Sequence, residues 1–594
     1  LDAFSHSDVP FERIVDALAT DRSLDRHPLF QVMLAFDNAP HRSVEDLPVS
    51  ALEIPTRTSE FDLTLVLADE QGDSASSTGQ IEYAVDLYQR ATVEQFASVI
   101  LTILNAAVAN PAVVVGDLPL ADTPALPSSM PDGTLLDVLS GGTAKSGAVA
   151  IDGLESMTYT ELDSRSNRIA RLLIAHGVGP ETLVALSLER SAEYIVALWA
   201  VVKAGGAFVP VDPRYPAARR EQMLRHIEIG FGGFEPTVHW LDETQAQQFS
   251  DLALTDADRL AALTPTHPAY VIHTSGSTGT PKPVVVTHQG VYALAQQVIP
   301  RYGVTSNSRV LHGYSVNFDA AVLELVLAFG AGATMVIAPP DLLGGDEMSA
   351  FLTAHRVTHY LSTPAVLATV PPTPGIETVA VGGDVLGTAV VDDWSAGRSM
   401  LNAYGPSEAT VVATLAESLR AGEPVTIGRP LAHVGAHVLD DRLHPVPLGG
   451  VGELYLAGSG VARGYHADPA STATRFVAAP GGTRMYRSGD LVRQQPSGML
   501  DYRGRRDDQV QINGVRVELG EIESALNAHP DVGGVVTAVR GNRIHAWVVG
   551  LDGQDAAQWL LDRLPLSMQP AVITRIDGIP LTGNGKVDLA ALHS

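Results

Sequence analysis

The stretch HTSGSTGTPKP (His273 to Pro283) holds two glycines, five hydroxyl side chains and one lysine directly after the apolar run AYVI. A strand that feeds such a loop exposes backbone N–H groups and hydroxyls that can converge on phosphate oxygens, and Lys282 adds a positive charge. The spacing is not that of a Walker loop, because Gly276, Gly279 and Lys282 stand three residues apart and proline follows the lysine. Taken alone, the stretch is either a phosphate loop or an ordinary turn.

Lysine is rare in this chain, where the positive charge is carried mainly by arginine. The lysines are Lys145, Lys203, Lys282 and Lys586. Lys586 lies in TGNGKVD, a glycine-rich stretch that we expect to form an exposed loop. A lysine on such a loop is usually only solvated, so its role depends on its context.

The overall composition excludes several classes of partner. With 39 basic and 67 acidic residues the net charge is −28, which opposes binding to nucleic acid or to an anionic membrane surface. The chain contains no cysteine, so neither disulfides nor thiolate chemistry of its own are expected. The longest apolar run (Tyr194 to Val211) contains Lys203 and a Gly-Gly pair, which predicts a helix followed by a strand and not a membrane span. We see no signal peptide, and we expect a cytoplasmic protein.

The elements that must position these residues follow an alternating pattern. Helical and short apolar strand patterns alternate after a proline-rich stretch, which predicts an α/β domain with parallel strands and crossover helices. A smaller α+β piece follows, and a mixed helix and strand pattern comes before the proline-rich stretch. We therefore predict the divisions 1–112, a linker at 113–133, a large domain at 134–506 and a small domain at 507–594. The segment 225–240 gives no clear pattern.

Nine motifs occur in a fixed order and decide what the opening loop is. Besides that loop they are MTYTEL (157–162), VVKAGGAFVPVDPRYP (201–216), NFDA (317–320), NAYGPSEAT (402–410), GELYLAGSGVARGYH (452–466), YRSGDL (486–491), GRRDDQVQINGVRVELGEIE (504–523) and GNGKVD (583–588). Together they resemble the adenylation domain of a nonribosomal peptide synthetase, a member of the adenylate-forming superfamily, over about residues 130 to 594. The resemblance implies a large adenylate-forming core and a small mobile α+β C-terminal subdomain.

The beginning of the chain resembles the C-terminal part of a condensation domain. The matching stretches are HSDVPFERIV (6–15) and RSLDRHPLFQVML (22–34). The condensation active-site signature, two adjacent histidines followed by Asp-Gly, does not occur in the sequence. We therefore expect a piece of a longer assembly line that does not form peptide bonds by itself, with the remainder of the condensation domain as a partner.

The resemblance implies a role for each motif residue in the activation of an amino acid by ATP and Mg²⁺. Lys586 is the implied catalytic lysine, Ser407 contacts the α-phosphate, Glu408 holds Mg²⁺, and Asp507 is the hinge of the small domain. The implied phosphate cradle is Thr274, Ser275, Gly276, Ser277, Thr278, Gly279 and Lys282. The other implied nucleotide contacts are Gly382, Gly383, Asp384, Asn402, Tyr404 on adenine, Asp490 on the ribose, and Arg505.

The resemblance also implies a substrate pocket. Asp319 is the implied anchor for an α-amino group, which predicts an α-amino acid as the substrate. The other implied lining positions are Ala320, Leu323, Tyr360, Ala380, Gly382, Ala403, Val411 and Val412, closed by Lys586. Since only Asp319 and Lys586 carry charge, we predict an uncharged side chain that is apolar or aromatic. Tyr360 either cuts the pocket short or hydrogen-bonds a polar tip.

The expected partners follow from the reaction that the resemblance implies. They are the amino acid, a separate carrier domain that supplies the phosphopantetheine thiol, and a small MbtH-like activator protein. The stretch LLGGDEM (342–348) is similar to a carrier motif, but Glu347 takes the place of the serine, so no carrier domain is expected here. Two alternatives stay open: an acyl- or aryl-CoA ligase of the same superfamily, and a silent scaffold that only docks neighbouring domains.

Overall fold

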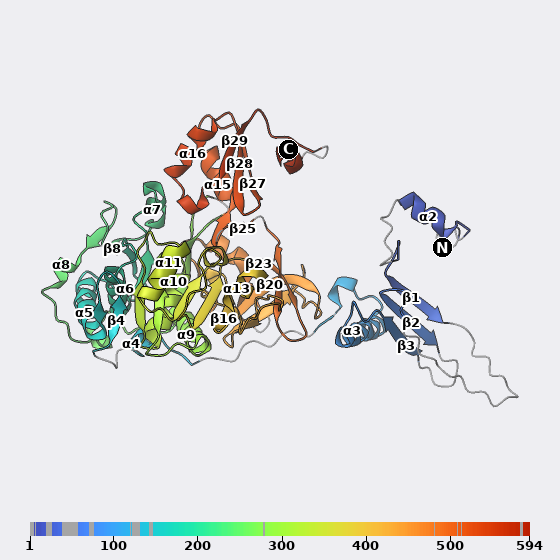
Figure 1. Cartoon of the computed structure of the whole chain (residues 1–594), viewed down its shortest axis with the longest axis horizontal. Helices are drawn as coiled ribbons and strands as arrows, with labels where there is room; N and C mark the ends of the chain where they lie inside the picture. Colours follow the sequence, from blue (N-terminus) through green and yellow to red (C-terminus); the bar gives the residue numbers. More distant parts are fainter. Residues whose placement is uncertain are drawn as a thin grey trace. The chain divides into compact units, whose positions relative to one another are not determined.

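The computed structural model describes residues 5, 8–18, 27–37, 58–69, 77–118, 120–121, 131–141, 147–276, 279–479, 482–507, 509–512, 514–582 and 586–593. The chain divides into two compact units. The first unit contains residues 1–122 with 444–450, and the second contains residues 123–443 with 451–594 (Figure 1). Each unit is described by itself.

The first unit is a small mixed sheet with helices. Its elements are α2 (Phe11–Leu18), β1 (Val32–Asp37), β2 (Leu63–Asp69), β3 (Ser77–Tyr83) and α3 (Arg90–Ala109). β2 is central, parallel to β1 and antiparallel to β3. Apolar side chains along β1 are largely exposed, with Val32, Leu34 and Phe36 at 59%, 56% and 65%. The described part of this unit therefore leaves an apolar strand uncovered.

Helix α3 was not singled out by the sequence analysis as a membrane candidate. Within the described residues it is the one helix that is long and apolar enough to cross a membrane by length and composition, and 6% of its apolar window is buried. A single helix of this kind is weak evidence of a membrane span, because core helices of soluble proteins and signal sequences have the same length and composition.

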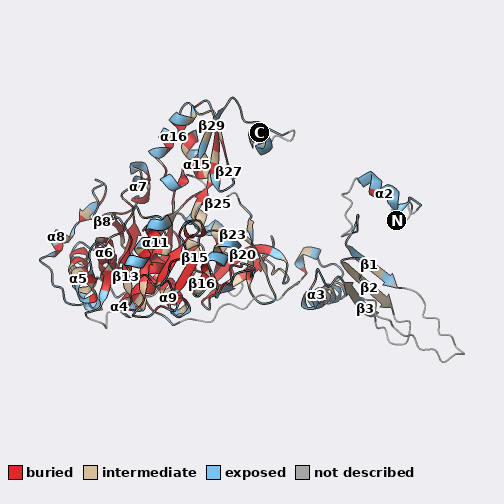
Figure 2. Cartoon of the chain, viewed as in Figure 1, coloured by how far each residue is buried: buried red, intermediate tan, exposed pale blue. Residues whose placement is uncertain are grey.

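The second unit is built around two large sheets. In its described residues, one sheet has nine strands in the order β18-β17-β16-β15-β14-β12-β13-β4-β5, and its central strands are parallel. The strands are β4 (Val149–Asp152), β5 (Met157–Thr158), β12 (Arg309–His312), β13 (Thr334–Ile337), β14 (His359–Ser362), β15 (Thr378–Gly382), β16 (Ser399–Tyr404), β17 (Thr414–Ala416) and β18 (Arg429–Pro430). Buried residues concentrate in these sheets, as Figure 2 shows in red. The predicted α/β class is confirmed.

The other large sheet carries the opening loop. Its order, over the residues described, is β21-β11-β10-β7-β6-β8-β9. The strands are β6 (Leu183–Leu186), β7 (Ala207–Pro210), β8 (Ile229–Phe231), β9 (His239–Leu241), β10 (Pro268–Thr274), β11 (Lys282–Thr287) and β21 (Gly464–Tyr465). The loop of interest joins β10 to β11, which pair antiparallel. The predicted strand before the loop is therefore present.

The segment 225–240, for which the sequence gave no clear pattern, forms most of two short strands, β8 and β9. β8 pairs in parallel with β6, and β9 pairs with β8. The glycines there have a packing reason, because a Cβ on Gly230 or Gly233 would lie within 2.5 Å of the Trp240 ring. The strands β8 and β9 therefore depend on a tertiary contact with the Trp240 ring, which the local sequence pattern does not reveal.

Helices cover these sheets. They are α4 (Leu135–Gly141), α5 (Tyr159–Ala175), α6 (Ala192–Ala204), α7 (Ala217–Met223), α8 (Glu243–Ala246), α9 (His288–Tyr302), α10 (Ala320–Gly330), α11 (Gly345–Ala354), α12 (Pro364–Leu367), α13 (Thr388–Trp394) and α14 (Pro469–Arg475). The most apolar of them, α6 and α10, are almost entirely buried. α6 ends at Gly205, whose left-handed φ of 92° turns the chain into β7. The run 194–211 is thus a buried helix and strand, as predicted.

A third sheet and a C-terminal segment (residues 509–593) complete the second unit. In the described residues the third sheet contains β19 (Val434–Leu439), β20 (Val451–Gly458), β22 (Phe476–Ala478), β23 (Arg484–Gln494) and β24 (Leu500–Arg505). The C-terminal segment contains the hairpin β25 (Gln509–Ile512) and β26 (Val515–Glu518), the sheet β27 (Gly534–Arg540), β28 (Arg543–Val549) and β29 (Val572–Ile576), and the helices α15 (Leu519–Asn527), α16 (Gly553–Leu561) and α17 (Leu589–His593). This segment has its own apolar core.

The loop between β12 and α10, which carries Asp319, is fastened by a buried carboxylate. Glu324 on α10 is fully buried and accepts hydrogen bonds from His312 Nδ1 (2.7 Å) and from the backbone N–H groups of Gly313 (3.0 Å) and Tyr314 (3.3 Å). Arg190 binds the carbonyl oxygens on the other side of the same loop. Because these donors are enclosed, the carboxylate fixes where α10 and its first residues lie.

Replacing Glu324 by alanine should destabilise the protein, because it leaves buried donors without an acceptor. We expect a loss of about 2 to 4 kcal/mol in the free energy of unfolding, measured by urea denaturation. Glu347→Ala, at an exposed position of α11, is the matched control and should change stability little. Equal stability of the two variants would contradict the assigned role of Glu324.

Candidate active site

A cavity of about 630 Å³ opens where the first two sheets, the third sheet and the C-terminal segment meet. Its wall contains the ends of β10, β15 and β16, the start of α10, and residues of β23 to β26. The carboxyl ends of parallel strands are the usual place for ligands in such sheets. The cavity is therefore the candidate site.

Asp319 is the charged group at the start of α10. It lines the cavity, and its Oδ2 accepts a hydrogen bond of 2.6 Å from the Ser407 hydroxyl. Desolvation raises the pKa of the Asp319 carboxyl above its ordinary value, although the bond from Ser407 acts in the opposite direction. A carboxylate in such a place gains from an incoming cation.

Most of the predicted pocket positions surround Asp319. The cavity is lined by Ala320, Leu323, Ala380, Gly382, Ala403, Val411 and Val412. Tyr360 is not among the lining residues; it is buried, with 2% of its surface exposed, and its hydroxyl donates to Ser362 Oγ at 3.3 Å. Tyr302 and Tyr314 line the cavity but were missed by the sequence analysis.

The predicted nucleotide contacts lie along another part of the same cavity. Asp490 on β23 accepts from the Tyr404 hydroxyl and, at 2.5 Å, from Arg505 Nη1. Burial raises the pKa of Asp490 despite these two partners. Gly382, Gly383, Asp384 and Asn402 line the cavity too. An aromatic ring, a buried carboxylate and a guanidinium thus converge on one wall.

Glu408, the predicted Mg²⁺ ligand, is a buried carboxylate with two partners. Its Oε1 accepts from the Tyr465 hydroxyl (2.8 Å) and its Oε2 from Arg516 Nη1 (3.0 Å). Burial alone raises the pKa of Glu408, but Arg516 and Tyr465 outweigh it and hold the pKa below its ordinary value. No group of three or more His, Cys, Asp or Glu side chains that could hold a metal occurs in the described residues. A single charged carboxylate fits Mg²⁺ that takes its other ligands from phosphate and water.

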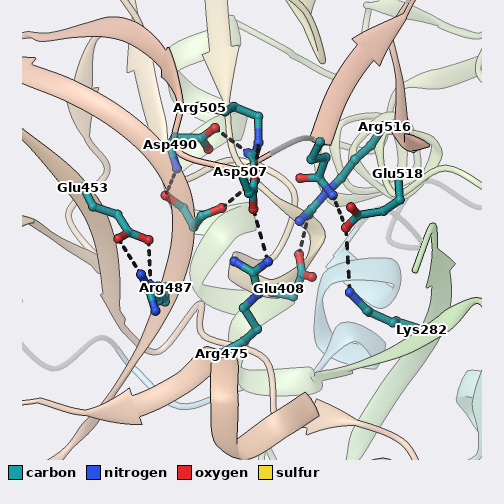
Figure 3. Close-up of polar contacts among 12 residues, drawn as sticks. Lys282, Glu408, Glu453, Arg475, Arg487, Asp490, Arg505, Asp507, Arg516 and Glu518 are labelled. Carbon is teal, nitrogen blue, oxygen red and sulfur yellow. Dashed lines mark hydrogen bonds and ion pairs between the residues drawn. The ribbon is translucent and has the colours of Figure 1, made fainter. Parts of the chain in front are cut away.

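The phosphate loop meets the C-terminal segment. The Ser275 hydroxyl donates to the Arg516 carbonyl (2.8 Å), Gly276 N–H donates to Glu521 Oε2 (3.1 Å), and Lys282 Nζ lies 3.8 Å from Glu518 Oε1. Figure 3 shows the Lys282 and Glu408 contacts side by side. Thr274 and Gly279 flank this part of the loop, whereas Ser277 and Thr278 lie outside the described residues. Groups suited to phosphate oxygens therefore contact carboxylates here.

Comparison with protein families matches most of the chain. The family described as AMP-binding enzyme matches residues 142–466, and the family described as condensation domain matches residues 1–124. The first match covers more than half of the 594 residues. The chain belongs to the AMP-binding enzyme family.

Individual relatives are peptide synthetases and a related biosynthetic protein. The chain is 38% identical over 637 residues to phosphinothricin tripeptide synthetase PhsC of Streptomyces viridochromogenes, covering all of this chain and 58% of PhsC. It is 40% identical over 476 residues to novobiocin biosynthesis protein H of Streptomyces niveus, covering 75% of this chain and 79% of that protein. It also matches CymA of Salinispora arenicola over 8% of the length of CymA. The chain thus spans only part of most of these relatives.

A solved structure resembles the whole chain. A four-domain nonribosomal peptide synthetase bound to AMP and glycine superposes with a TM-score of 0.74 at 26% identity, covering 99% of this chain and 48% of that one. The predicted identity, an adenylation domain preceded by the C-terminal part of a condensation domain, is confirmed. The chain therefore contains an adenylation domain of the nonribosomal peptide synthetase type.

In this adenylation domain the hairpin β25–β26 occupies the site and Lys586 does not. Gln509, Gln511, Gly514, Val515 and Arg516 line the cavity. Lys586 is exposed and is not among the lining residues. The structure therefore does not bring Lys586 together with Asp319 and Glu408.

Arg516 is a site residue that the sequence analysis did not assign. Its guanidinium pairs with Glu408 and lies 3.4 Å from the Tyr486 hydroxyl, and its neighbours Glu518 and Glu521 bind the phosphate loop and Arg219. Gly514 N–H donates to Asp384 Oδ2 at 3.3 Å. These contacts fasten the hairpin to the core of the adenylation domain.

Asp507, the predicted hinge, lies between β24 and β25. Its carboxylate accepts from Arg505 Nε (2.7 Å) and Arg475 Nη2 (3.2 Å). Burial raises the pKa of Asp507, but the bond from Arg505 and the charge of Arg475 outweigh burial and hold it below its ordinary value. Asp507 is thus held by ion pairs with Arg475 and Arg505, both of which precede the junction in the chain (Figure 3).

Removing Arg516 should loosen the hairpin, because the pair with Glu408 is enclosed. We expect Arg516→Ala to speed amide hydrogen exchange in peptides covering 509–518 by about tenfold, measured by mass spectrometry without ligands. Arg540→Ala, at an exposed end of β27, is the control and should leave this exchange unchanged. Unchanged protection in Arg516→Ala would contradict the fastening role.

Proposed function

We propose that the chain activates an α-amino acid with an uncharged, mainly apolar or aromatic side chain as its aminoacyl-adenylate. We further propose that it passes the acyl group to the phosphopantetheine thiol of a separate carrier domain. The observation that carries this proposal is the Asp319 carboxylate, which faces a cavity whose neighbouring pocket positions carry no charge. An α-ammonium group would supply the missing cation, whereas a fatty or aryl acid would not.

The first half-reaction forms a bond between a substrate carboxylate oxygen and the α-phosphorus of ATP and breaks the bond to pyrophosphate. Asp319 would orient the substrate by its amino group. The Ser407 hydroxyl, which donates to Asp319 in this structure, would then turn to donate to a phosphate oxygen. Tyr404, Asp490 and Arg505 would hold the adenosine, and Glu408 would hold Mg²⁺, which neutralises phosphate charge. The protein thus acts by positioning and by charge stabilisation.

The side chain of the substrate is proposed from the wall of the pocket. Ala380, Gly382 and Ala403 leave depth beyond Asp319, and Leu323, Val411 and Val412 give it an apolar surface. A charged side chain would be buried there without a partner. A sizeable uncharged side chain fits best.

The two half-reactions require two arrangements of the C-terminal segment in our proposal, one with Lys586 in the site and one with Arg516 there. Adenylate formation needs Lys586 beside the carboxylate and phosphates, and the C-terminal segment must then turn about Asp507. Lys586 is exposed, and none of the described residues encloses it, which supports the proposed movement of this lysine. A similar solved structure, holo-PA1221, is an NRPS protein that contains adenylation and PCP domains, which supports the proposed acceptor.

The remaining partners follow from the same assignment. We propose the divisions 1–112, 113–133, 134–506 and 507–594, with the exposed strand β1 covered by the remainder of the condensation domain. A small MbtH-like activator and a cytoplasmic location complete the proposal. The net charge of −28 supports the absence of nucleic-acid and membrane partners.

ATP–pyrophosphate exchange across a panel of amino acids tests the proposal. Exchange that depends on one or a few uncharged amino acids is the expected result. Exchange with acyl or aryl acids only would instead support the CoA ligase, and no exchange with any acid would support the silent scaffold.

Lys586→Ala should abolish adenylate formation and leave transfer from a supplied aminoacyl-adenylate largely intact. The expected loss in exchange is about a hundredfold or more, as for other preorganised charges at a reacting centre. Arg543→Ala, an exposed cation on β28, is the control and should retain both activities. Equal loss of both half-reactions in Lys586→Ala would refute the assignment.

Asp507→Pro should spare pyrophosphate exchange but slow loading of a carrier domain, because proline restricts the backbone at the junction. Asp507→Ala removes the carboxylate without that restriction and is the matched control. We expect loading by the alanine variant to stay closer to wild type. Unchanged loading in Asp507→Pro would count against a hinge at this residue.

A further inference from the structure

Three tyrosines lie close together in or beside the pocket that Asp319 lines. Tyr302 and Tyr314 line the cavity, and Tyr360 is buried close to them. Their closeness shows in Tyr314, whose pKa is raised first by burial and then by the charge of Glu324, with Tyr360 and Tyr302 contributing further. We call these three residues the tyrosine cluster.

The hydroxyl groups of the tyrosine cluster make few hydrogen bonds in the described structure. Tyr302 is 1% exposed, and its hydroxyl is a buried polar group without a hydrogen-bond partner in the described structure. The hydrogen bonds recorded for Tyr314 are made by its main chain, through N–H to Glu324 and through the carbonyl from Arg190. Tyr360 makes one long bond to Ser362. A buried hydroxyl normally finds a partner, so one is missing here.

The main chain of Tyr302 is firmly placed. Tyr302 is the last residue of α9, and Gly303 ends the helix with a left-handed φ of 69°. The Tyr302 carbonyl accepts from His359 Nε2 (3.0 Å) on β14 and from Thr378 Oγ1 (3.1 Å) on β15. Because the residue is anchored to two strands of the pocket wall, its hydroxyl cannot readily move away to find water.

A charged group is a poor partner for this hydroxyl. Asp319 and Glu324 both disfavour further negative charge nearby, as their effect on Tyr314 shows. A cationic end group would find no carboxylate of its own, because the proposed α-ammonium group takes Asp319 and both oxygens of Glu324 are engaged by His312 and by backbone N–H groups. The missing partner is therefore uncharged.

We propose that Tyr302 is a specificity residue that selects amino acids whose side chain is apolar along its length and ends in an uncharged hydrogen-bonding group. Such ends are a hydroxyl, an amide or a ring N–H, and the end group bonds to Tyr302 Oη. This inference rests on the proposed function and narrows its substrate class. It moves the polar-tip role that the sequence analysis considered for Tyr360 to Tyr302, which lines the cavity whereas Tyr360 does not.

Pyrophosphate exchange by the full chain, with kcat and KM for the proteinogenic amino acids, tests the inference. Tyrosine with phenylalanine and glutamine with methionine are pairs that differ mainly in the polar end. We expect the best substrate to have a polar end and to exceed its apolar counterpart by about a hundredfold in kcat/KM. In Tyr302→Phe this ratio should fall by about tenfold or more, because activity with the polar member is lost while the apolar member is unaffected.

Two further readouts separate recognition from a structural role. Since the Tyr302 hydroxyl is unpaired, Tyr302→Phe should keep or raise the melting temperature. Tyr159→Phe is the matched control: its buried hydroxyl donates to the Ala333 carbonyl away from the cavity, so this variant should lower the melting temperature and keep the substrate ratio.

The outcomes are distinct. A best substrate with a purely hydrocarbon, thioether or charged side chain overturns the inference and leaves the proposed amino-acid activation standing. An unchanged ratio in Tyr302→Phe also overturns it. No exchange with any amino acid overturns the proposed function itself, and the inference with it.

Discussion

The Asp319 carboxylate is the constraint on which the rest of the site depends. A charged oxygen pair beside apolar walls is costly unless a cation arrives, and the Ser407 hydroxyl is its one short hydrogen-bond partner among the described residues. The surrounding structure keeps Asp319 there. Glu324 binds the backbone of the preceding loop, and Asp319 is the N-cap residue of α10, which is almost entirely buried. The proposed anchor for the substrate is thus held in place by the buried core of the nine-stranded sheet.

On the phosphate side of the site, charged groups of the core are already paired, and their partners come from the C-terminal segment. Lys282 and the N–H of Gly276 face Glu518 and Glu521, while Glu408 faces Arg516. Of these groups, Lys282, Gly276 and Glu408 are the ones that the family resemblance assigns to phosphate or to Mg²⁺. The hairpin and α15 therefore satisfy, with side chains of the protein, the charges that the core presents to a nucleotide. The same charges cannot serve both partners at once, which fits two successive arrangements of the C-terminal segment.

Motif order made the charged residues of the site predictable, because each stands in a short stretch with a recognisable pattern. Asp319, Asp490 and Glu408 were predicted in this way; Asp319 and Asp490 line one cavity, and Glu408 pairs with Arg516 at its wall. Residues whose role arises from packing were not predictable.

Tyr302 ends a helix whose sequence gives no sign of the cavity, and its place follows from bonds to β14 and β15. Arg516 meets Glu408 across 108 positions of the chain, and the strands in 225–240 depend on the Trp240 ring over Gly230. Lys586 was predicted as catalytic, yet its position relative to the cavity depends on the arrangement of the C-terminal segment, which no local pattern encodes.

The most direct test of the central claim compares each activated amino acid with the same acid lacking its α-amino group, in ATP–pyrophosphate exchange. If Asp319 recognises an α-ammonium group, the desamino acid should be activated at least about a hundredfold less efficiently, because the buried carboxylate stays unpaired. Equal activation of the two acids would contradict the claim and would place the chain among ligases of simple carboxylic acids.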